Sequence, residues 1–232
     1  MSDKIEDFIS TVSHELRTPL TSIRGFSQTI LSSWDKLDDE SKKRFIKIIE
    51  EQSNRLINLV ENMLTVTKNH ELILKDVVVK PVVQTVVSLI KTQYPAHTYE
   101  INISDRIPSM LADKDKFQQI MTNLIENAAK YSDENSVITV NAETEQEFVA
   151  VKVVNTGIGI EEGDFERIFE KFSRADNPLT RKTEGSGLGL YITKNLTEKM
   201  GGTISVQSKD STVVFTVKLP VSNIEARLKC SQ

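Results

Sequence analysis

The chain has 232 residues, enough for two domains, and its 38% hydrophobic and 27% charged residues are typical of a globular protein. A formal net charge of −4 provides no field that would draw the chain to nucleic acid or to an anionic membrane. The single cysteine, Cys230, excludes an internal disulfide and a Cys-rich metal site, and it fits a reducing compartment. No apolar run is long enough for a membrane span and no signal-peptide pattern opens the sequence, so we expect a cytoplasmic chain.

Residues 1–70 are predicted to form a hairpin of two helices. The first helix has apolar residues at spacings of three, four and seven: Ile5, Phe8, Val12, Leu16, Ile23, Phe26 and Ile30. Residues 34–39 break the pattern, and Asp38 and Asp39 favour a new helix start. The second helix carries a heptad seam: Phe45, Ile49, Gln52, Leu56, Leu59, Met63 and Val66.

Such a hairpin has too little interior to bury both apolar stripes by itself. Two hairpins that pair as a four-helix bundle would bury them, so we predict a homodimer. The alternative is a hairpin that folds back on the second domain of its own chain. The sustained seam favours the dimer.

From about residue 72 the periodicity becomes mixed. Strands are predicted at 74–80, 98–104, 137–143, 148–155, 203–208 and 213–219. Helices are predicted at 81–94, 113–131, 164–172 and 188–200. This order indicates an α+β domain over residues 71–220 with helices packed on one sheet face, followed by a tail at 221–232. The polar, aperiodic stretch 173–184 is predicted to be a lid loop.

His14 points away from the apolar stripe of the first helix. Glu15 is adjacent to it, Thr18 lies one turn further on, and Pro19 has no amide with which to continue the helix ladder. A neutral imidazole is a nucleophile, and a carboxylate that holds its second ring proton raises that nucleophilicity.

Residues 13–20, Ser-His-Glu-Leu-Arg-Thr-Pro-Leu, resemble the H box of the sensor histidine kinases of two-component systems. The resemblance implies that His14 accepts a phosphoryl group from ATP, that Glu15 acts as the base, and that Thr18 positions a water for dephosphorylating the partner. The implied partner is the receiver domain of a response regulator. The input would then be sensed by another part of a longer protein or by a separate one.

Residues 119–132 resemble the N box of the same family. Asn123, Asn127 and Lys130 lie at i, i+4 and i+7, so one helical face presents two amides and an ammonium group. The resemblance implies that Asn127 coordinates Mg²⁺, and that the face and Tyr131 bind the nucleotide.

Three further segments resemble the first glycine box (155–160), the F box (168–172) and the second glycine box (185–190). Glycines that open a helix let backbone N–H groups approach phosphates. The nucleotide contacts implied here are Asn155, Gly157, Gly159, Ile160, Lys171, Arg174, Gly185, Ser186, Gly187, Leu188 and Gly189. The resemblance covers residues 4–220 and implies the GHKL (Bergerat) α/β sandwich shared with gyrase, Hsp90 and MutL.

Asn155 departs from the pattern, because the family has an Asp here that accepts a hydrogen bond from the adenine amino group. An amide oxygen can still accept that bond but brings no charge, so we expect weaker ATP binding. The leading hypothesis is a protein-histidine kinase (ATP:protein-L-histidine phosphotransferase) that also acts as a phosphatase on its partner. A docking scaffold or pure phosphatase with a decayed ATP site is the alternative. The H box and the seam weigh against a third option, a GHKL ATPase machine or serine kinase.

Overall fold

The computed structural model describes the backbone of residues 2–67, 71–171, 173 and 187–222. Side chains are described over the same ranges except at 2–11, 14, 58, 61–62 and 64–67. The chain divides into two compact units, residues 1–69 and 70–232, and each is described by itself. Among the described residues no helix has the length and apolar character that a membrane crossing requires.

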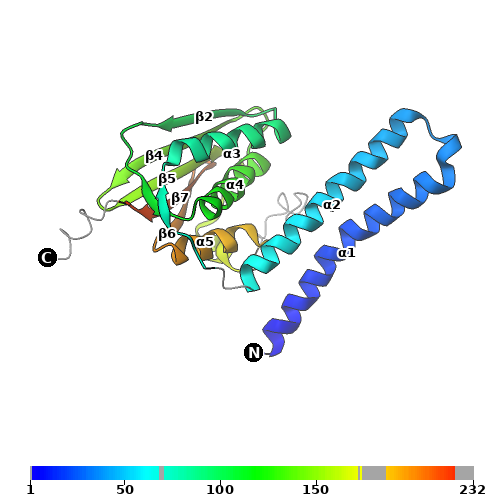
Figure 1. Cartoon of the computed structure of the whole chain (residues 1–232), viewed down its shortest axis with the longest axis horizontal. Coiled ribbons are helices and arrows are strands. Elements are labelled where there is room, and N and C mark those ends of the chain that lie inside the picture. Colours follow the sequence, from blue (N-terminus) through cyan, green and yellow to red (C-terminus); the bar gives the residue numbers. More distant parts are fainter. Residues whose placement is uncertain (1, 68–70, 172, 174–186, 223–232) are drawn as a thin grey trace. The chain divides into compact units, whose positions relative to one another are not determined.

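The first unit is a helical hairpin (Figure 1). Helix α1 (Ser2–Ser33) continues through Pro19, a 3₁₀ turn follows at Trp34–Lys36, and α2 spans Asp39–Thr67. The Asp38 carboxylate accepts a hydrogen bond from the Ser41 amide at 2.6 Å, which confirms the predicted start of the second helix.

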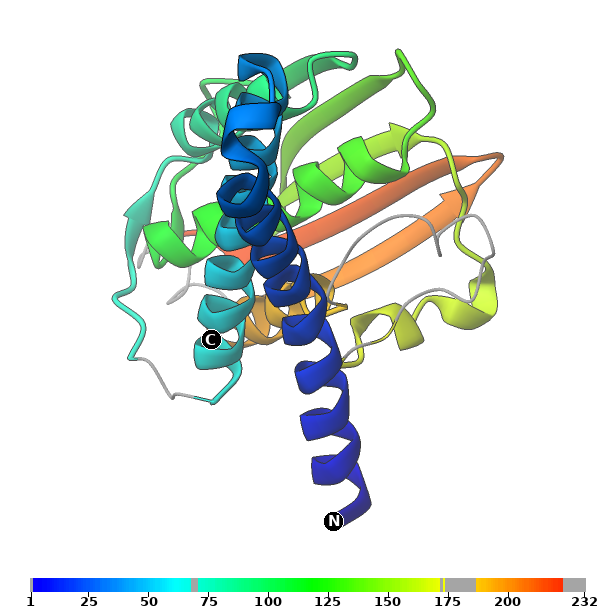
Figure 2. The ribbon, with the colours of Figure 1, turned by 90° about the vertical axis from the view of Figure 1, so that its right-hand side faces the viewer.

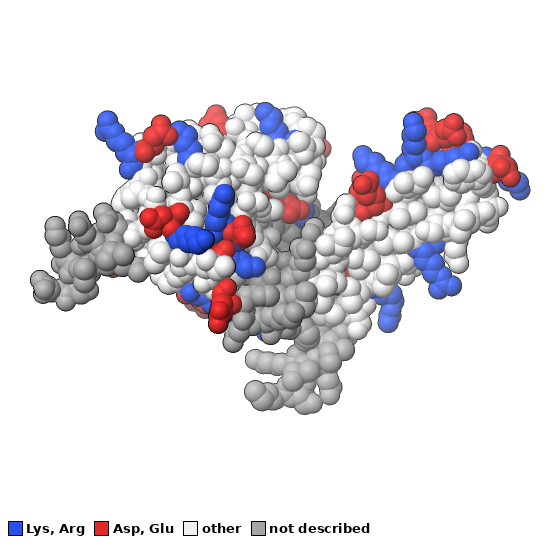
Figure 3. Space-filling model, viewed as in Figure 1, with Lys and Arg blue, Asp and Glu red and all other residues white. Residues whose placement is uncertain are grey.

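The hairpin leaves much of its apolar surface uncovered. Between the helices, the Phe26 and Phe45 rings lie 5.2 Å apart, and Ile30 and Leu59 are buried. Other large apolar residues are exposed: Leu20, Leu31, Ile46, Ile57 and Val60. In Figure 3 charged side chains gather at the loop end of the hairpin, whereas a long uncharged area runs along the face turned to the viewer. The hairpin therefore offers more apolar surface than its own two helices bury.

The second unit is built on a five-stranded sheet with the order β2-β4-β5-β7-β6. Its strands are β2 (Thr98–Ile103), β4 (Val137–Glu145), β5 (Phe148–Thr156), β7 (Thr212–Pro220) and β6 (Thr203–Lys209). Only the β2–β4 pair is parallel. A separate antiparallel pair joins β1 (Lys75–Val77) to β3 (Met110–Ala112).

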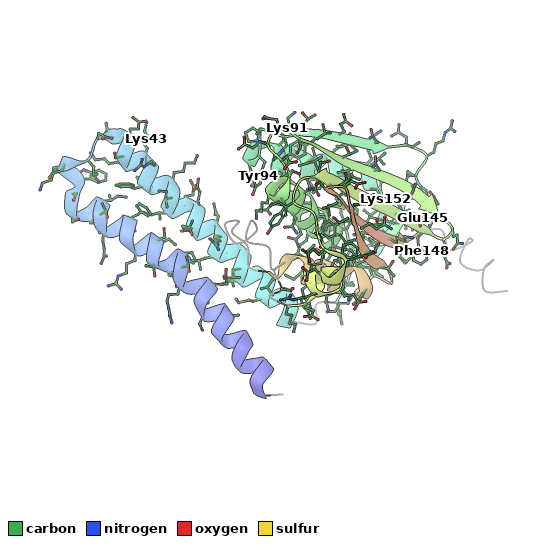
Figure 4. The ribbon with its side chains drawn as sticks, turned by 180° about the vertical axis from the view of Figure 1, so that it is seen from behind. Lys43, Lys91, Tyr94, Glu145, Phe148 and Lys152 are labelled. Atoms are coloured by element: carbon green, nitrogen blue, oxygen red, sulfur yellow. The ribbon has the colours of Figure 1, made fainter. Side chains whose placement is uncertain are left out.

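Helices cover one face of this sheet. Figures 1 and 2 show α3 (Val79–Gln93), α4 (Lys114–Tyr131) and α5 (Gly189–Lys199) on the same side. Strand residues that face the helices are buried, as Val151 and Val153 of β5 are. The opposite face carries an ion pair between Lys152 and Glu145 of β4 (Figure 4). A second ion pair links Lys218 of β7 to the same carboxylate. The predicted α+β sandwich is confirmed.

Two local predictions are wrong. The helix predicted at 164–172 is instead a pair of 3₁₀ turns, Glu162–Asp164 and Arg167–Phe169, and Phe172 lies outside the described residues. The apolar residues of segment 164–172 fill only one helical turn. The ring of Phe169 packs edge-on against the ring of Phe215 of β7, with 6.3 Å between the ring centres. Strand β3 was not predicted, because three residues are too few to establish a period.

Candidate functional site

Helix α4 presents the predicted polar face, and one of its amides binds α5. The half-buried Asn123 donates through Nδ2 to the Gly189 carbonyl at 3.3 Å and to Thr193 Oγ1 at 3.4 Å. The Thr193 hydroxyl in turn donates to the same carbonyl at 2.9 Å. These bonds occupy the Asn123 amide group and hold the first turn of α5 against the polar face of α4, so Asn123 has a structural role beside any contact with a ligand.

Asn127, one turn further along α4, is suited to a ligand. Its half-buried side chain makes no hydrogen bond to any residue that the structure describes, so its carbonyl oxygen is available. Mg²⁺ is usually held by one or two protein oxygens together with phosphates and several waters. Within the described ranges no group of three His, Cys, Asp or Glu could hold a metal ion unaided. The residues present therefore fit a Mg²⁺ ion held jointly with the phosphates of a nucleotide.

Lys130 belongs to a charged network that the motifs did not reveal. Its ammonium lies 2.7 Å from the Glu126 carboxylate, one helical turn back. Tyr94, which directly follows α3 (Figure 4), hydrogen-bonds to Glu126. Burial, and then the charge of Glu126, raise the pKa of Tyr94 to about 12. The i, i+4 spacing of Glu126 and Lys130 could have predicted the ion pair, but no pattern in the sequence points to Tyr94.

The end of β5 lies beside the end of α4. A Cβ on Gly157 would sit 2.2 Å from the Tyr131 carbonyl oxygen, so only glycine fits at this position. The backbone amide of Ile158 donates to that same carbonyl at 3.0 Å. Further on, the Ile160 amide donates to Ser208 Oγ at 3.0 Å, and Gly159 lies next to that hydroxyl. The first glycine segment is thereby fixed between α4 and β6.

Asn155 is buried on the helix-covered face of the sheet, only 3% exposed. It follows the buried Val151 and Val153 at intervals of two, so the three side chains point to the same face. Its amide makes no hydrogen bond to any residue in the described part of the chain. The amide is not sealed off from solvent, because the fully buried polar side-chain atom without a partner among the described residues is Ser173 Oγ, so a ligand can reach Asn155.

The second glycine segment is described only from Gly187 onward. Gly187 has a φ of +65°, a left-handed conformation that glycine adopts without strain, Leu188 is fully buried, and α5 begins at Gly189. The N-terminus of α5 thus lies against Asn123, where a helix dipole and free amides favour an anion. Gly185, Ser186 and Arg174, together with the predicted lid, lie outside the described residues, apart from Ser173. Lys171 is exposed, with its ammonium 5.0 Å from the centre of the Tyr191 ring.

The predicted phosphoacceptor segment lies in the middle of α1. The His14 side chain is outside the described set. Next to it, the Glu15 carboxylate lies 3.6 Å from the Arg55 guanidinium of α2. Thr18 is exposed. A shallow depression of about 410 Å³ on the same helix is lined by Ser13, Leu16, Arg17, Leu20, Thr21 and Arg24. The contact with Arg55, which spacing along one helix could not predict, restricts the position of the Glu15 carboxylate.

Two family models match the chain in succession. Residues 4–72 match the His Kinase A (phospho-acceptor) domain, and residues 112–223 match the histidine kinase-, DNA gyrase B- and HSP90-like ATPase. The chain belongs to the sensor histidine kinases of two-component systems.

Relatives of this chain include two named bacterial kinases. It is 32% identical to the sensor histidine kinase WalK of Bacillus subtilis over 94% of this chain and 37% of WalK. It is 30% identical to the signal transduction histidine-protein kinase ArlS of Staphylococcus epidermidis over 93% of this chain and 48% of ArlS. The chain thus spans less than half the length of these two relatives.

Solved structures show the same architecture. Histidine kinase ThkA, in complex with the response regulator protein TrrA, superposes with a TM-score of 0.73 at 27% identity over 93% of this chain and 61% of ThkA. Full-length ShkA in complex with AMPPNP gives 0.67 at 27% identity over 93% of this chain and 46% of ShkA.

Proposed function

We propose that this chain is the catalytic core of a sensor histidine kinase that transfers the γ-phosphoryl group of ATP to His14 and then to the receiver aspartate of a response regulator. The observation that carries the proposal is the contact of Asn123 with the start of α5, which brings the polar face of α4 to a helix N-terminus. Amides, an ammonium group and free backbone N–H groups then converge where phosphates would lie.

The ATP site can be assigned residue by residue. Asn155 takes the edge of the base, and Lys130 and the α5 N-terminus take phosphates. Asn127 would hold Mg²⁺, which supplies charge neutralisation for the triphosphate when bound. The glycine segments contribute backbone contacts, together with Tyr131, Lys171 and the predicted residues outside the described ranges.

The phosphoryl steps follow from the groups around residue 14. A ring nitrogen of His14 forms a bond to the γ-phosphorus, the bond to the bridging oxygen breaks, ADP leaves, and Glu15 takes the ring proton. Arg55 holds the Glu15 carboxylate in place. The phosphoryl group then passes to the receiver aspartate and frees His14. Thr18 orients a water that hydrolyses the aspartyl phosphate. The depression with Arg17 and Arg24 suits an acidic receiver surface.

The exposed apolar residues of the hairpin also favour a homodimer. Leu20 and Leu31 on α1 are eleven residues apart, as are Ile46 and Ile57 on α2. Eleven residues make about three turns, so each pair shares one side of its helix. A second copy would cover both sides in a four-helix bundle.

Labelled ATP tests the proposed activity. Incubation of the chain with Mg²⁺ and γ-labelled ATP should give acid-labile, alkali-stable label on the protein. His14→Ala should abolish it, because the nucleophile is lost. His97→Ala is the matched control, since the His97 side chain hydrogen-bonds to Ser136 and belongs to none of the proposed sites, so the label should stay intact. Thr18→Ala should keep the label but slow hydrolysis of the partner's aspartyl phosphate.

The neutral Asn155 gives specific support to a second function, a scaffold or phosphatase with a weakened ATP site. Nucleotide binding without any label on the chain would favour it over the kinase. Label that persists in His14→Ala would contradict the assigned phosphoacceptor.

A further inference from the structure

Asn155 is the feature of the second unit that packing explains least. The other buried polar residues among those described are threonines, of which Thr193 and Thr197 donate hydrogen bonds to carbonyls one turn back in α5. Asn155, in contrast, brings two donors and an acceptor into the interior and pairs none of them within the described residues. Among the described residues the fully buried side-chain atom left without a partner is Ser173 Oγ, so the Asn155 amide still reaches solvent, from which a polar ligand can approach it.

The inward positions of β5 and β7 beside Asn155 carry no charged side chain. Across the ladder Asn155 faces Val213 of β7, which is buried, and the inward positions beside this pair are Val153 and Phe215, also buried. Neither strand therefore competes with a ligand for the amide, and neither fixes which way the amide is turned. Rotation about the last side-chain bond, whose preference is broad and roughly two-fold, exchanges donor and acceptor.

The edge of a purine base presents a donor and an acceptor side by side. In adenine the 6-amino group donates and ring nitrogen N1 accepts. In a 6-oxopurine, such as hypoxanthine or guanine, the 6-oxygen accepts and N1–H donates. A primary amide complements either edge with two parallel hydrogen bonds, simply by turning over. A carboxylate has acceptors only. Opposite position 6 it pairs with the adenine amino group but faces the 6-oxygen of a 6-oxopurine, where only the neighbouring N1–H is left for it to accept.

We propose that Asn155 makes this nucleotide site tolerant at position 6 of the purine, so that 6-oxopurine nucleotides bind about as well as adenine nucleotides. The inference rests on the proposed function, in which this site binds a nucleotide and Asn155 meets the base. Selectivity against a wrong ligand usually comes from an unpaired or repelled group in the complex. The amide leaves no such group with either base.

The test compares ADP with IDP, which differ only at position 6 and at the N1 proton. Calorimetric titration of the full chain in Mg²⁺ should give dissociation constants within about threefold of each other, because both complexes contain two neutral hydrogen bonds. In Asn155→Asp, ADP should bind about fivefold more tightly, since a charged acceptor replaces a neutral one. IDP should bind to the same variant about tenfold more weakly than ADP does, since its 6-oxygen faces the carboxylate at the position where ADP offers an amino group.

Two further variants show whether Asn155 forms hydrogen bonds with both bases or does not touch the base at all. Asn155→Ala should weaken the binding of ADP and of IDP alike, by about thirtyfold, because it removes two neutral hydrogen bonds from each complex. Asn141→Asp makes the same change of charge on the other face of the sheet, opposite Lys152, and should alter neither affinity.

The possible outcomes test the inference about Asn155 separately from the proposed function. A chain that binds ADP but discriminates against IDP more than tenfold would overturn this inference and leave the proposed function standing. An Asn155→Ala variant with unchanged affinities would also overturn it, because the base would then not touch residue 155. A chain that binds neither ADP nor ATP would overturn both the inference and the proposed kinase activity.

Discussion

Tyr94 holds a carboxylate next to the proposed nucleotide site. Its hydroxyl bonds to Glu126, Glu126 pairs with Lys130, and the Tyr99 hydroxyl donates to the Tyr94 carbonyl at 3.1 Å. This short series of contacts links the end of α3 to the ammonium that we assign to a phosphate. Lys130 is therefore positioned by a neighbouring helix as well as by its own.

The network should make stability sensitive to alkaline pH. An unfolded tyrosine loses its proton near pH 10, whereas burial raises the pKa of Tyr94 to about 12 in the folded chain. The protonated Tyr94 hydroxyl therefore contributes fully to the free energy of unfolding below pH 10, and this contribution is lost as the pH rises from 10 to 12. Tyr94→Phe removes this group, so its unfolding free energy should fall less over that window than that of the unmodified chain. Denaturant titrations at several pH values measure the difference.

Tyr99→Phe provides the comparison for this experiment. Burial also raises the pKa of Tyr99, but Tyr99 is less buried than Tyr94 and has no carboxylate among the causes of its shift. Tyr99→Phe should therefore reduce the fall in unfolding free energy between pH 10 and 12 by less than Tyr94→Phe does. An identical alkaline loss in Tyr94→Phe and the unmodified chain would show that Tyr94 does not carry this effect.

At the scale of single elements, α4 is capped by Asp113, the residue that precedes it. The carboxylate of Asp113 accepts from the backbone amides of Asp115 and Lys116, both at 3.1 Å, and from Ile73 at 3.0 Å. One side chain thus caps the helix that carries Asn127 and also holds the segment before β1. The sequence predicted a helix from residue 113 but not the bond to residue 73, which lies 40 positions away.

Loss of this cap should lower stability measurably. Asp113→Ala leaves three amides without their acceptor, and removal of an N-cap typically costs about 1–2 kcal/mol. Asp113→Asn keeps an acceptor and should lose less than half as much. Asp115→Ala is the matched control, because Asp115 is exposed in the same turn and should change stability by less than about 0.5 kcal/mol. Equal losses in Asp113→Ala and Asp115→Ala, followed by circular dichroism in denaturant, would refute the cap's importance.

The elements also differ in how well the sequence alone predicted them. Long periodic segments such as those of α3 and α4 were predicted to within a few residues, since many apolar positions contribute to the pattern. The F-box region was not, because tertiary packing of Phe169 on Phe215 decided its conformation. At the site, the resemblance to the N box and to the first glycine box pointed to Asn127 and Asn155 as ligand contacts, which stay predictions. The contacts Glu15–Arg55 and Tyr94–Glu126 join separate elements, and one-dimensional spacing does not encode them.

For the whole molecule, the proposed dimer can be tested with two residues of equal exposure. Ile57 on α2 and Leu89 on α3 are both 54% exposed. Ile57→Lys places a charge in the proposed bundle interface, where an unpaired buried charge is strongly unfavourable, so light scattering should show a monomer at micromolar concentration. Leu89→Lys lies in the other unit and should remain dimeric. An unmodified chain that is monomeric at that concentration would exclude the bundle.

The neighbouring central strands β5 and β7 are far apart in sequence, and residues 157–211, with the segments resembling the glycine and F boxes, run between them. In polymer terms the paired ends, Thr156 opposite Thr212, close a loop. The entropy of closing a flexible loop grows only with the logarithm of its length, by about 0.6 kcal/mol for each doubling. The free energy of pairing β5 with β7 is therefore almost insensitive to the length of the parts of this segment that lie outside α5 and β6. Insertions and deletions there can reshape the surface offered to a nucleotide while the strand register stays as it is.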